Sequence, residues 1–128
     1  MKWQFYLAAA VVVVAFFIYK QFRSRLNNEE AAAVSQALAA GARIVDVRTP
    51  AEYAAGHVPN AVNVPLGQLQ SSLKKVGKKR KPVVVYCRSG SRSASAVSIL
   101  RSRGFAQVLD MKTQGNWQRL QQQLATAQ

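Results

Sequence analysis

The hydrophobic pattern divides the chain into an apolar N-terminal segment and a longer region of short, alternating apolar runs. From Trp3 to Tyr19 the sequence has no charged residue and only one polar residue, Gln4. This length is the lower limit for a helix that spans a bilayer. Aromatic residues near both ends of the segment are typical of interfacial anchors. The pattern predicts a transmembrane anchor with its basic flank over residues 1–26.

A cleaved signal peptide is the main alternative for this segment. It would have a shorter apolar core and small residues at a cleavage site. Here the bulky and basic run at 20–23 follows directly, which favours an uncleaved, single-pass anchor. Lys2 precedes the span, and three basic residues follow it, namely Lys20, Arg23 and Arg25. The positive-inside rule then predicts that residues 27–128 lie in the cytoplasm.

Residues 27–128 are predicted to form one soluble domain in which strands alternate with helices. Short runs rich in β-branched residues predict strands over 44–47, 61–64, 83–86 and 107–109. Amphipathic spacing and helix-capping signals predict helices over 29–40, 50–55, 66–76, 93–103 and 116–125. The last helix is expected to bury Trp117, Leu120 and Leu124. Alternation of this kind predicts an α/β fold, a parallel sheet covered by helices on both faces.

Charge narrows the range of partners. The chain has 18 basic and 5 acidic residues, a net charge of +13, which points to anionic partners. The basic residues are not interleaved with exposed aromatics, so a nucleic-acid stacking platform is not favoured. Six of them lie in the run Lys74–Lys81. This run is compatible with a solvated loop, with an anionic lipid surface, or with an acidic protein partner.

The only cysteine, Cys87, follows the apolar run at 83–86 and opens a loop that leads into a helix. Backbone N–H groups at such a helix start have no partner of their own, and they stabilise a thiolate. Arg88 and Arg92 add positive charge, so an anion is the natural co-substrate. The alternative is an inert, buried cysteine that packs as a small hydrophobe. The polar loop favours a reactive and exposed thiol. A single cysteine excludes an internal disulfide.

Three stretches of the sequence form one pattern. The first is 44–53 (IVDVRTPAEY), the second is 56–66 (GHVPNAVNVPL), and the third is the loop that begins at Cys87. Together they resemble the rhodanese family of sulfurtransferases. Their order and spacing match the family over about residues 28–125. One stretch departs from the pattern: residues 111–117 contain one glycine where family members usually carry a glycine pair before a tryptophan.

The resemblance implies sulfur transfer through a persulfide of Cys87. The thiolate would take the outer sulfur of thiosulfate or of a persulfide donor, and cyanide or a thiol would then accept that sulfur. No metal or organic cofactor is implied. The loop residues Arg88, Ser89, Gly90, Ser91 and Arg92 would form a cradle of backbone amides, and the two arginine side chains would favour an anionic donor.

Asp46 and Arg48, at the end of a neighbouring strand, are expected to support the site and not to react. Whether Asp46 pairs with Arg92, or Arg48 with Glu52, is left open. The resemblance gives His57, the only histidine, a structural role in a turn.

Two other functions compete with the sulfurtransferase interpretation. Cysteine phosphatases and arsenate reductases of similar fold place five residues between the cysteine and an arginine, whereas four residues separate Cys87 from Arg92 here. The shorter loop resembles that of the sulfur-handling members. A membrane-tethered adaptor or sulfur-delivery module with little thiosulfate turnover is the second alternative, favoured by the anchor and the basic run.

Overall fold

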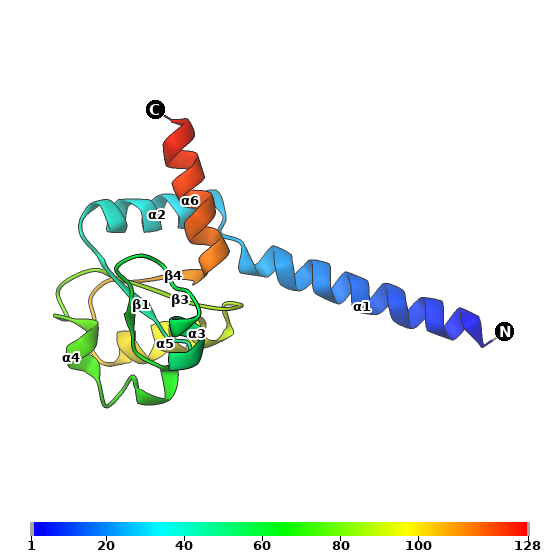
Figure 1. Ribbon diagram of the computed structural model, residues 1–128, viewed down its shortest axis with the longest axis horizontal. Helices are drawn as coiled ribbons and strands as arrows, with labels where there is room; N and C mark the ends of the chain where they lie inside the picture. The colour runs from blue at the N-terminus through cyan, green and yellow to red at the C-terminus, as the bar shows by residue number, and fades with distance from the viewer. Residues whose placement is uncertain (1, 128) are drawn as a thin grey trace.

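The computed structural model describes residues 2–127, and its most distinct feature is a helix that projects away from the body of the molecule (Figure 1). This helix, α1 (Trp3–Ser24), has no buried residue. Its 22 residues extend for about 33 Å, enough to cross the hydrocarbon core of a bilayer. By length and composition it is a candidate membrane span, although an N-terminal signal sequence has the same features. The helix continues past Tyr19, the predicted end of the apolar segment.

The remaining chain is built on a parallel sheet of four strands. These strands are β1 (Arg43–Asp46), β2 (Val62–Asn63), β3 (Val83–Cys87) and β4 (Val108–Thr113). They lie in the order β2-β1-β3-β4, and every neighbouring pair is parallel. The parallel α/β sheet predicted from the sequence is therefore confirmed.

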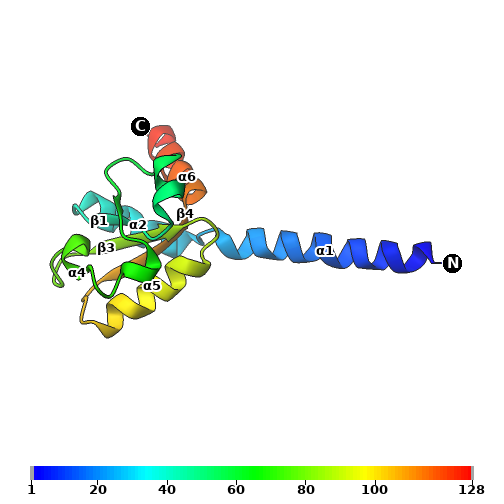
Figure 2. The ribbon, with the colours of Figure 1, turned by 60° about the horizontal axis from the view of Figure 1, so that its bottom comes forward.

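Helices cover both faces of this sheet (Figures 1 and 2). One face packs against α2 (Asn28–Ala39) and α6 (Gln114–Thr126). The other packs against α5 (Ser91–Ser102), the short 3-10 helix η1 (Leu66–Gln68) and α4 (Leu73–Val76). The five-residue helix α3 (Pro50–Ala54) follows β1, and Thr49 and Glu52 close its N-terminus as a capping box.

Strand β3 is buried along its whole length, as its unbroken apolar sequence predicts. Successive side chains alternate between the faces: Val83, Val85 and Cys87 belong to the cluster beneath α5, and Val84 and Tyr86 to the opposite cluster. This alternation directs the Cys87 side chain toward α5.

Two predicted helices differ in the structure. The helix expected over 66–76 is broken into η1 and α4, because Ser71 turns the chain and donates through its backbone N–H and its hydroxyl to the Gln68 carbonyl. In α6, Leu120 is buried and Trp117 is half-buried, but Leu124 is 52% exposed. The last turns of α6 extend beyond the sheet, so the expected burial of Leu124 was wrong (Figure 1).

Strand β4 is longer than the predicted 107–109 and contains a bulge. Val85 is paired with Asp110 and Tyr86 with Lys112, which leaves Met111 as the extra residue. Lys112 has φ of +67°, a left-handed conformation that side chains other than glycine rarely adopt. The irregularity falls in the stretch whose sequence departs from the family pattern.

Candidate functional site

Cys87 ends β3 at the carboxyl edge of the sheet, and its sulfur closes the N-terminus of α5. The N–H of Gly90 donates to Cys87 Sγ over 3.0 Å, and the N–H of Ser93 donates to it over 3.3 Å. Gly90 has φ of +96°, the conformation that turns the loop back over the sulfur and that glycine adopts without strain. Two amide donors at a helix start stabilise negative charge on this sulfur.

The thiol is buried, contrary to the exposure expected from the sequence. Cys87 is 0% exposed, because the loop folds over it and its side chain packs in the cluster beneath α5. Above it, Arg88, Ser89 and Ser91 are exposed, and Gly90 is half-buried. The loop is thus a polar cover over the sulfur.

Ser93 is a further contact that the candidate loop, 87–92, did not include. It is buried, its hydroxyl donates to the Gly90 carbonyl over 3.0 Å, and its oxygen lies 3.5 Å from Cys87 Sγ as acceptor for the thiol proton. From the sequence, Ser93 was either a hydrogen-bond donor of the loop or a cap of the helix. Its position six residues after Cys87, at the third residue of α5, is the signal that identifies the contact.

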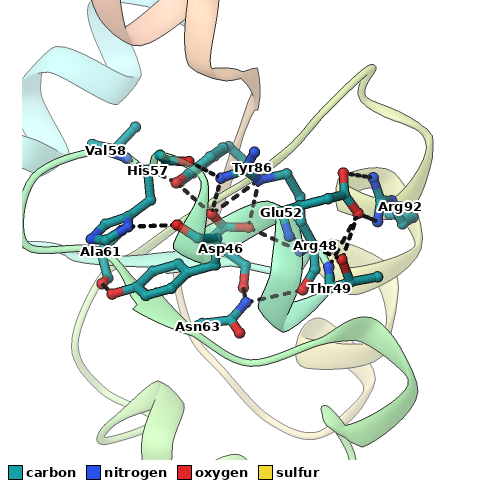
Figure 3. Close-up of polar contacts among 12 residues, drawn as sticks. Asp46, Arg48, Thr49, Glu52, His57, Val58, Ala61, Asn63, Tyr86 and Arg92 are labelled. Atoms are coloured by element: carbon teal, nitrogen blue, oxygen red, sulfur yellow. Dashed lines mark hydrogen bonds and ion pairs between the residues drawn. The ribbon is translucent and has the colours of Figure 1, made fainter.

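Arg92 is engaged by a carboxylate rather than free in the site. Its guanidinium pairs with Glu52 of α3 through two contacts of 2.7 and 2.9 Å (Figure 3). Hydrogen bonding from Arg92, with a smaller contribution from Thr49, lowers the pKa of Glu52 to about 2. Arg92 therefore clamps α5 to α3, and its charge is largely matched by Glu52 rather than left for an anionic donor.

Asp46 and Arg48 pair with each other, so the structure forms neither of the two pairings that the sequence left open, Asp46 with Arg92 or Arg48 with Glu52. Arg48 donates to the Asp46 carboxylate through Nη2 at 2.7 Å and through Nε at 3.0 Å, and both residues are buried (Figure 3). Hydrogen bonding to Asp46 raises the pKa of Arg48. Arg48 also donates to the Gly56 carbonyl over 2.7 Å. The pair holds the end of β1 to the loop that follows α3.

Tyr86 connects this pair to the strand that carries the cysteine. Its hydroxyl donates to Asp46 Oδ2 over 2.6 Å and accepts the N–H of Val58 over 3.0 Å. Burial, followed by the hydrogen bond to Asp46, raises the pKa of Tyr86. Because Tyr86 directly precedes Cys87, the Asp46–Arg48–Tyr86 network fixes the backbone from which the thiol projects. The side chains of this network bond to one another and to the backbone of Gly56 and Val58 rather than to Sγ, and the supporting role of Asp46 and Arg48 stays a prediction.

His57 lies on the exposed turn after α3, where it contacts Tyr53. Its Nδ1 is 2.8 Å from the Tyr53 carbonyl oxygen, and its ring stacks on the Tyr53 ring with centroids 3.6 Å apart. These contacts give the histidine a structural role.

The candidate site thus contains a cysteine at the carboxyl edge of a parallel sheet, and two backbone amides donate to its sulfur. Residues 29–114 of the chain match the family described as the rhodanese-like domain. The chain belongs to the rhodanese-like family. In this family a cysteine carries the transferred sulfur as a persulfide, and Cys87 is the only cysteine present.

Three similar proteins place this rhodanese-like domain among sulfurtransferases. A sulfurtransferase of Allochromatium vinosum is 37% identical over 89 residues, which cover 68% of this chain and 82% of that protein. The thiosulfate sulfurtransferase PspE of Escherichia coli is 37% identical over 65 residues, which cover 50% and 62% respectively. The solved structure of the human single-domain sulfurtransferase TSTD1 superposes with a TM-score of 0.60 at 29% identity, over 67% of this chain and 89% of that one.

Proposed function

We propose that this rhodanese-like protein transfers sulfane sulfur from thiosulfate or a persulfide donor to a thiophilic acceptor, with Cys87 as the carrier. The observation that carries the proposal is the pair of amide donors, Gly90 and Ser93, on the Cys87 sulfur. The likeness to the thiosulfate sulfurtransferase PspE supports thiosulfate as donor.

The reaction has two displacement steps at sulfur. The Cys87 thiolate attacks the outer sulfur of thiosulfate, a sulfur–sulfur bond forms, and the donor bond breaks with its electron pair leaving on sulfite. Cyanide or a thiolate then attacks the outer sulfur of the persulfide, which releases thiocyanate or a new persulfide and regenerates the Cys87 thiolate. The amides of Gly90 and Ser93 hold the negative charge on sulfur before and after transfer.

Burial of Cys87 adds a requirement to this mechanism. Because the side chain is 0% exposed, a donor reaches Sγ only when the loop over it moves aside. Exposed Arg88, Ser89 and Ser91 have no buried packing to lose in such a movement. Alkylation of Cys87 by iodoacetamide in the native protein is therefore expected, and a thiol that stays unmodified until the protein unfolds would contradict the proposal.

The decisive experiment uses the full chain in neutral detergent micelles. Wild type is expected to form thiocyanate from thiosulfate and cyanide, and the Cys87→Ser variant is not. Mass spectrometry after thiosulfate alone is expected to find one added sulfur atom on Cys87. The double variant Cys87→Ser/Ser98→Cys is the matched control, because it moves the thiol to an exposed position of α5 without the amide donors. Equal rates for wild type and this control would overturn the proposal.

Burial of the thiol also favours a second candidate, a tethered sulfur-delivery module or adaptor with little thiosulfate turnover. In that case the persulfide forms once on Cys87 but thiocyanate accumulates only slowly. Comparison of single-turnover persulfide formation with steady-state thiocyanate production separates the two functions.

The same proposal places the protein in a membrane through α1, as a single-pass anchor with the sulfurtransferase domain in the cytoplasm. The apolar length of α1 and the basic residues Lys20, Arg23 and Arg25 after its apolar segment support this placement.

A further inference from the structure

A pocket of about 480 Å³ separates the end of α1 from the loop that covers Cys87. Phe16, Tyr19, Lys20 and Arg23 of α1 form one wall, and loop residues 89–91 form another. The loop before α5 lies beside the end of α1 in both views of the fold (Figures 1 and 2). The apolar helix thus contributes side chains to the surroundings of the site.

The stretch that departs from the family pattern holds α1 in this position. Asn116 is buried, and its side-chain amide donates to the Ser24 carbonyl over 2.7 Å and to the Met111 carbonyl over 2.8 Å. Lys112 Nζ donates to the Arg23 carbonyl over 3.4 Å and lies 3.3 Å from a carboxylate oxygen of Glu30. Two elements, β4 and α6, therefore bond to the end of α1, and Glu30 of α2 pairs with the lysine that makes one of these contacts.

Lys112 also lies close to the loop. A β-carbon added at Gly90 would come within 3.5 Å of Lys112 Cβ, an ordinary van der Waals distance, so Lys112 borders the turn that covers the sulfur. Strained backbone of this kind persists where the surrounding contacts impose it, often at functional sites. Lys112 thus lies between the end of α1 and the reactive loop, bonded to the first and next to the second.

The cations that line this pocket outnumber its one carboxylate, Asp110, whose pKa is raised by burial. Within residues 2–127, neither Lys20 nor Arg23 has an ion-pair partner, whereas Arg92 of the loop is matched by Glu52. The Lys20 ammonium lies 6.0 Å from the Phe16 ring centroid, and the Arg23 guanidinium lies 5.8 Å from that of Tyr19. These aromatic contacts orient the two charges without neutralising them.

We infer that Lys20 and Arg23 are specificity-determining residues of the sulfurtransferase site, and that they draw small anionic sulfur donors toward the loop over Cys87. The inference rests on the proposed function. Charges that line the mouth of a site raise the local concentration of an oppositely charged substrate, and the effect falls as salt screens them. With α1 in the membrane as proposed above, the site would take its donor near the membrane surface.

The test compares two alkylating reagents that differ in charge but not in chemistry. Cys87 is the only cysteine, so its alkylation by anionic iodoacetate and by neutral iodoacetamide is measured directly by mass spectrometry on the full chain in neutral detergent. The ratio of the two rates reports the electrostatic attraction at the site, independently of sulfur transfer.

The Lys20→Gln/Arg23→Gln variant is expected to lower the ratio of iodoacetate to iodoacetamide rates about threefold at low salt. The iodoacetamide rate should stay within the wild-type range, which shows that the loop is intact. The Lys20→Arg/Arg23→Lys variant keeps both positive charges and should show the wild-type ratio. Lys78→Gln/Lys81→Gln is the matched control and should leave the ratio unchanged. It removes the same charge from the segment that follows α4, and α4 lies on the side of the domain away from α1 (Figure 1).

Thiosulfate kinetics provide the second readout. The KM for thiosulfate is expected to rise about threefold in Lys20→Gln/Arg23→Gln, with kcat unchanged. A wild-type protein that transfers sulfur, together with a variant whose rate ratio and KM are unchanged, would overturn the role of α1 and leave the proposed function intact. A wild-type protein in which neither reagent modifies Cys87 would overturn both.

Discussion

At the scale of single residues, Glu52 shows how a charge outside the reactive loop stabilises it. Its carboxylate pairs with Arg92, and this contact lowers the pKa of Glu52 from 4.5 to about 2. Because the folded-state pKa lies below the unfolded one, the pair stabilises the fold above about pH 4.5, and this contribution disappears as pH falls to about 2. The thermal unfolding midpoint should therefore fall less steeply with acid between pH 4.5 and 2 in Glu52→Gln than in wild type.

Glu29→Gln is the control for this pH dependence. Glu29 is exposed in the first turn of α2 and forms no ion pair within residues 2–127. Its replacement should leave the acid slope of the unfolding midpoint as in wild type. The same slope in wild type and Glu52→Gln would mean that the ion pair with Arg92 does not form in solution.

Tyr86 offers a second prediction at this scale. Its hydroxyl satisfies both the buried Asp46 carboxylate and the buried N–H of Val58. Tyr86→Phe leaves both groups short of a partner, so the free energy of unfolding should fall by about 1–3 kcal/mol in urea titrations. In Tyr53→Phe, the lost hydroxyl donates to the Ala61 carbonyl in a half-buried position, where water can replace it, and a smaller loss is expected. Equal losses in the two variants would contradict this account.

At the scale of elements, the bulge in β4 predicts that glycine at position 112 is more stable than alanine, the reverse of the usual order inside helices and strands. Lys112 has φ of +67°, where a β-carbon costs energy and glycine does not. Lys112→Gly should therefore be more stable than Lys112→Ala by roughly 0.5–1 kcal/mol, as measured by chemical unfolding. At Gln121, an exposed position inside α6, the glycine variant should instead be the less stable one. If the alanine variant were more stable than the glycine variant at both positions, Lys112 would not adopt the left-handed conformation.

The elements themselves could largely be predicted, because their signals are local. The unbroken apolar run of β3 and the capping box at Thr49 each depend on residues close in the sequence. Burial of Cys87 could not be predicted in this way, because it depends on how Gly90 turns the loop and on packing against α5. The helix expected over 66–76 failed for a related reason, since Ser71 forms a turn that competes with the helix.

The ion pairs of the site show the same limit. Asp46, Arg48, Glu52 and Arg92 gather near one edge of the sheet, and opposite charges there can pair in more than one way. The choice depends on three-dimensional geometry: Asp46 and Arg48 lie close together after β1, and Glu52 faces α5 from α3. The contacts that join β4 and α6 to the end of α1 link residues that are even farther apart in the sequence, and no motif identified them.

At the scale of the whole molecule, the two surfaces considered for membrane contact lie on opposite sides of the domain. The first is α1; the second is the exposed basic run, Lys74–Lys81, which begins in α4 (Figures 1 and 2). With α1 in a bilayer, α4 faces away from that bilayer, and surface potentials decay within about 10 Å at ordinary ionic strength. The arrangement therefore gives no support to the expected contact between this run and anionic lipid.

This separation predicts which substitutions release the protein from a membrane. Val13→Lys places a charge near the middle of α1, at a cost to insertion of about 3 kcal/mol, and should move the full chain from the pellet to the supernatant after alkaline extraction. Neutralising Lys78, Lys79, Arg80 and Lys81 to glutamine should leave the chain in the pellet, even in vesicles rich in anionic lipid. Release by the neutralised run but not by Val13→Lys would place the membrane contact on the side of α4. In that case α1 would not be the anchor. Its last turns, which line the pocket next to the Cys87 loop, would then lie in solution and not at a membrane.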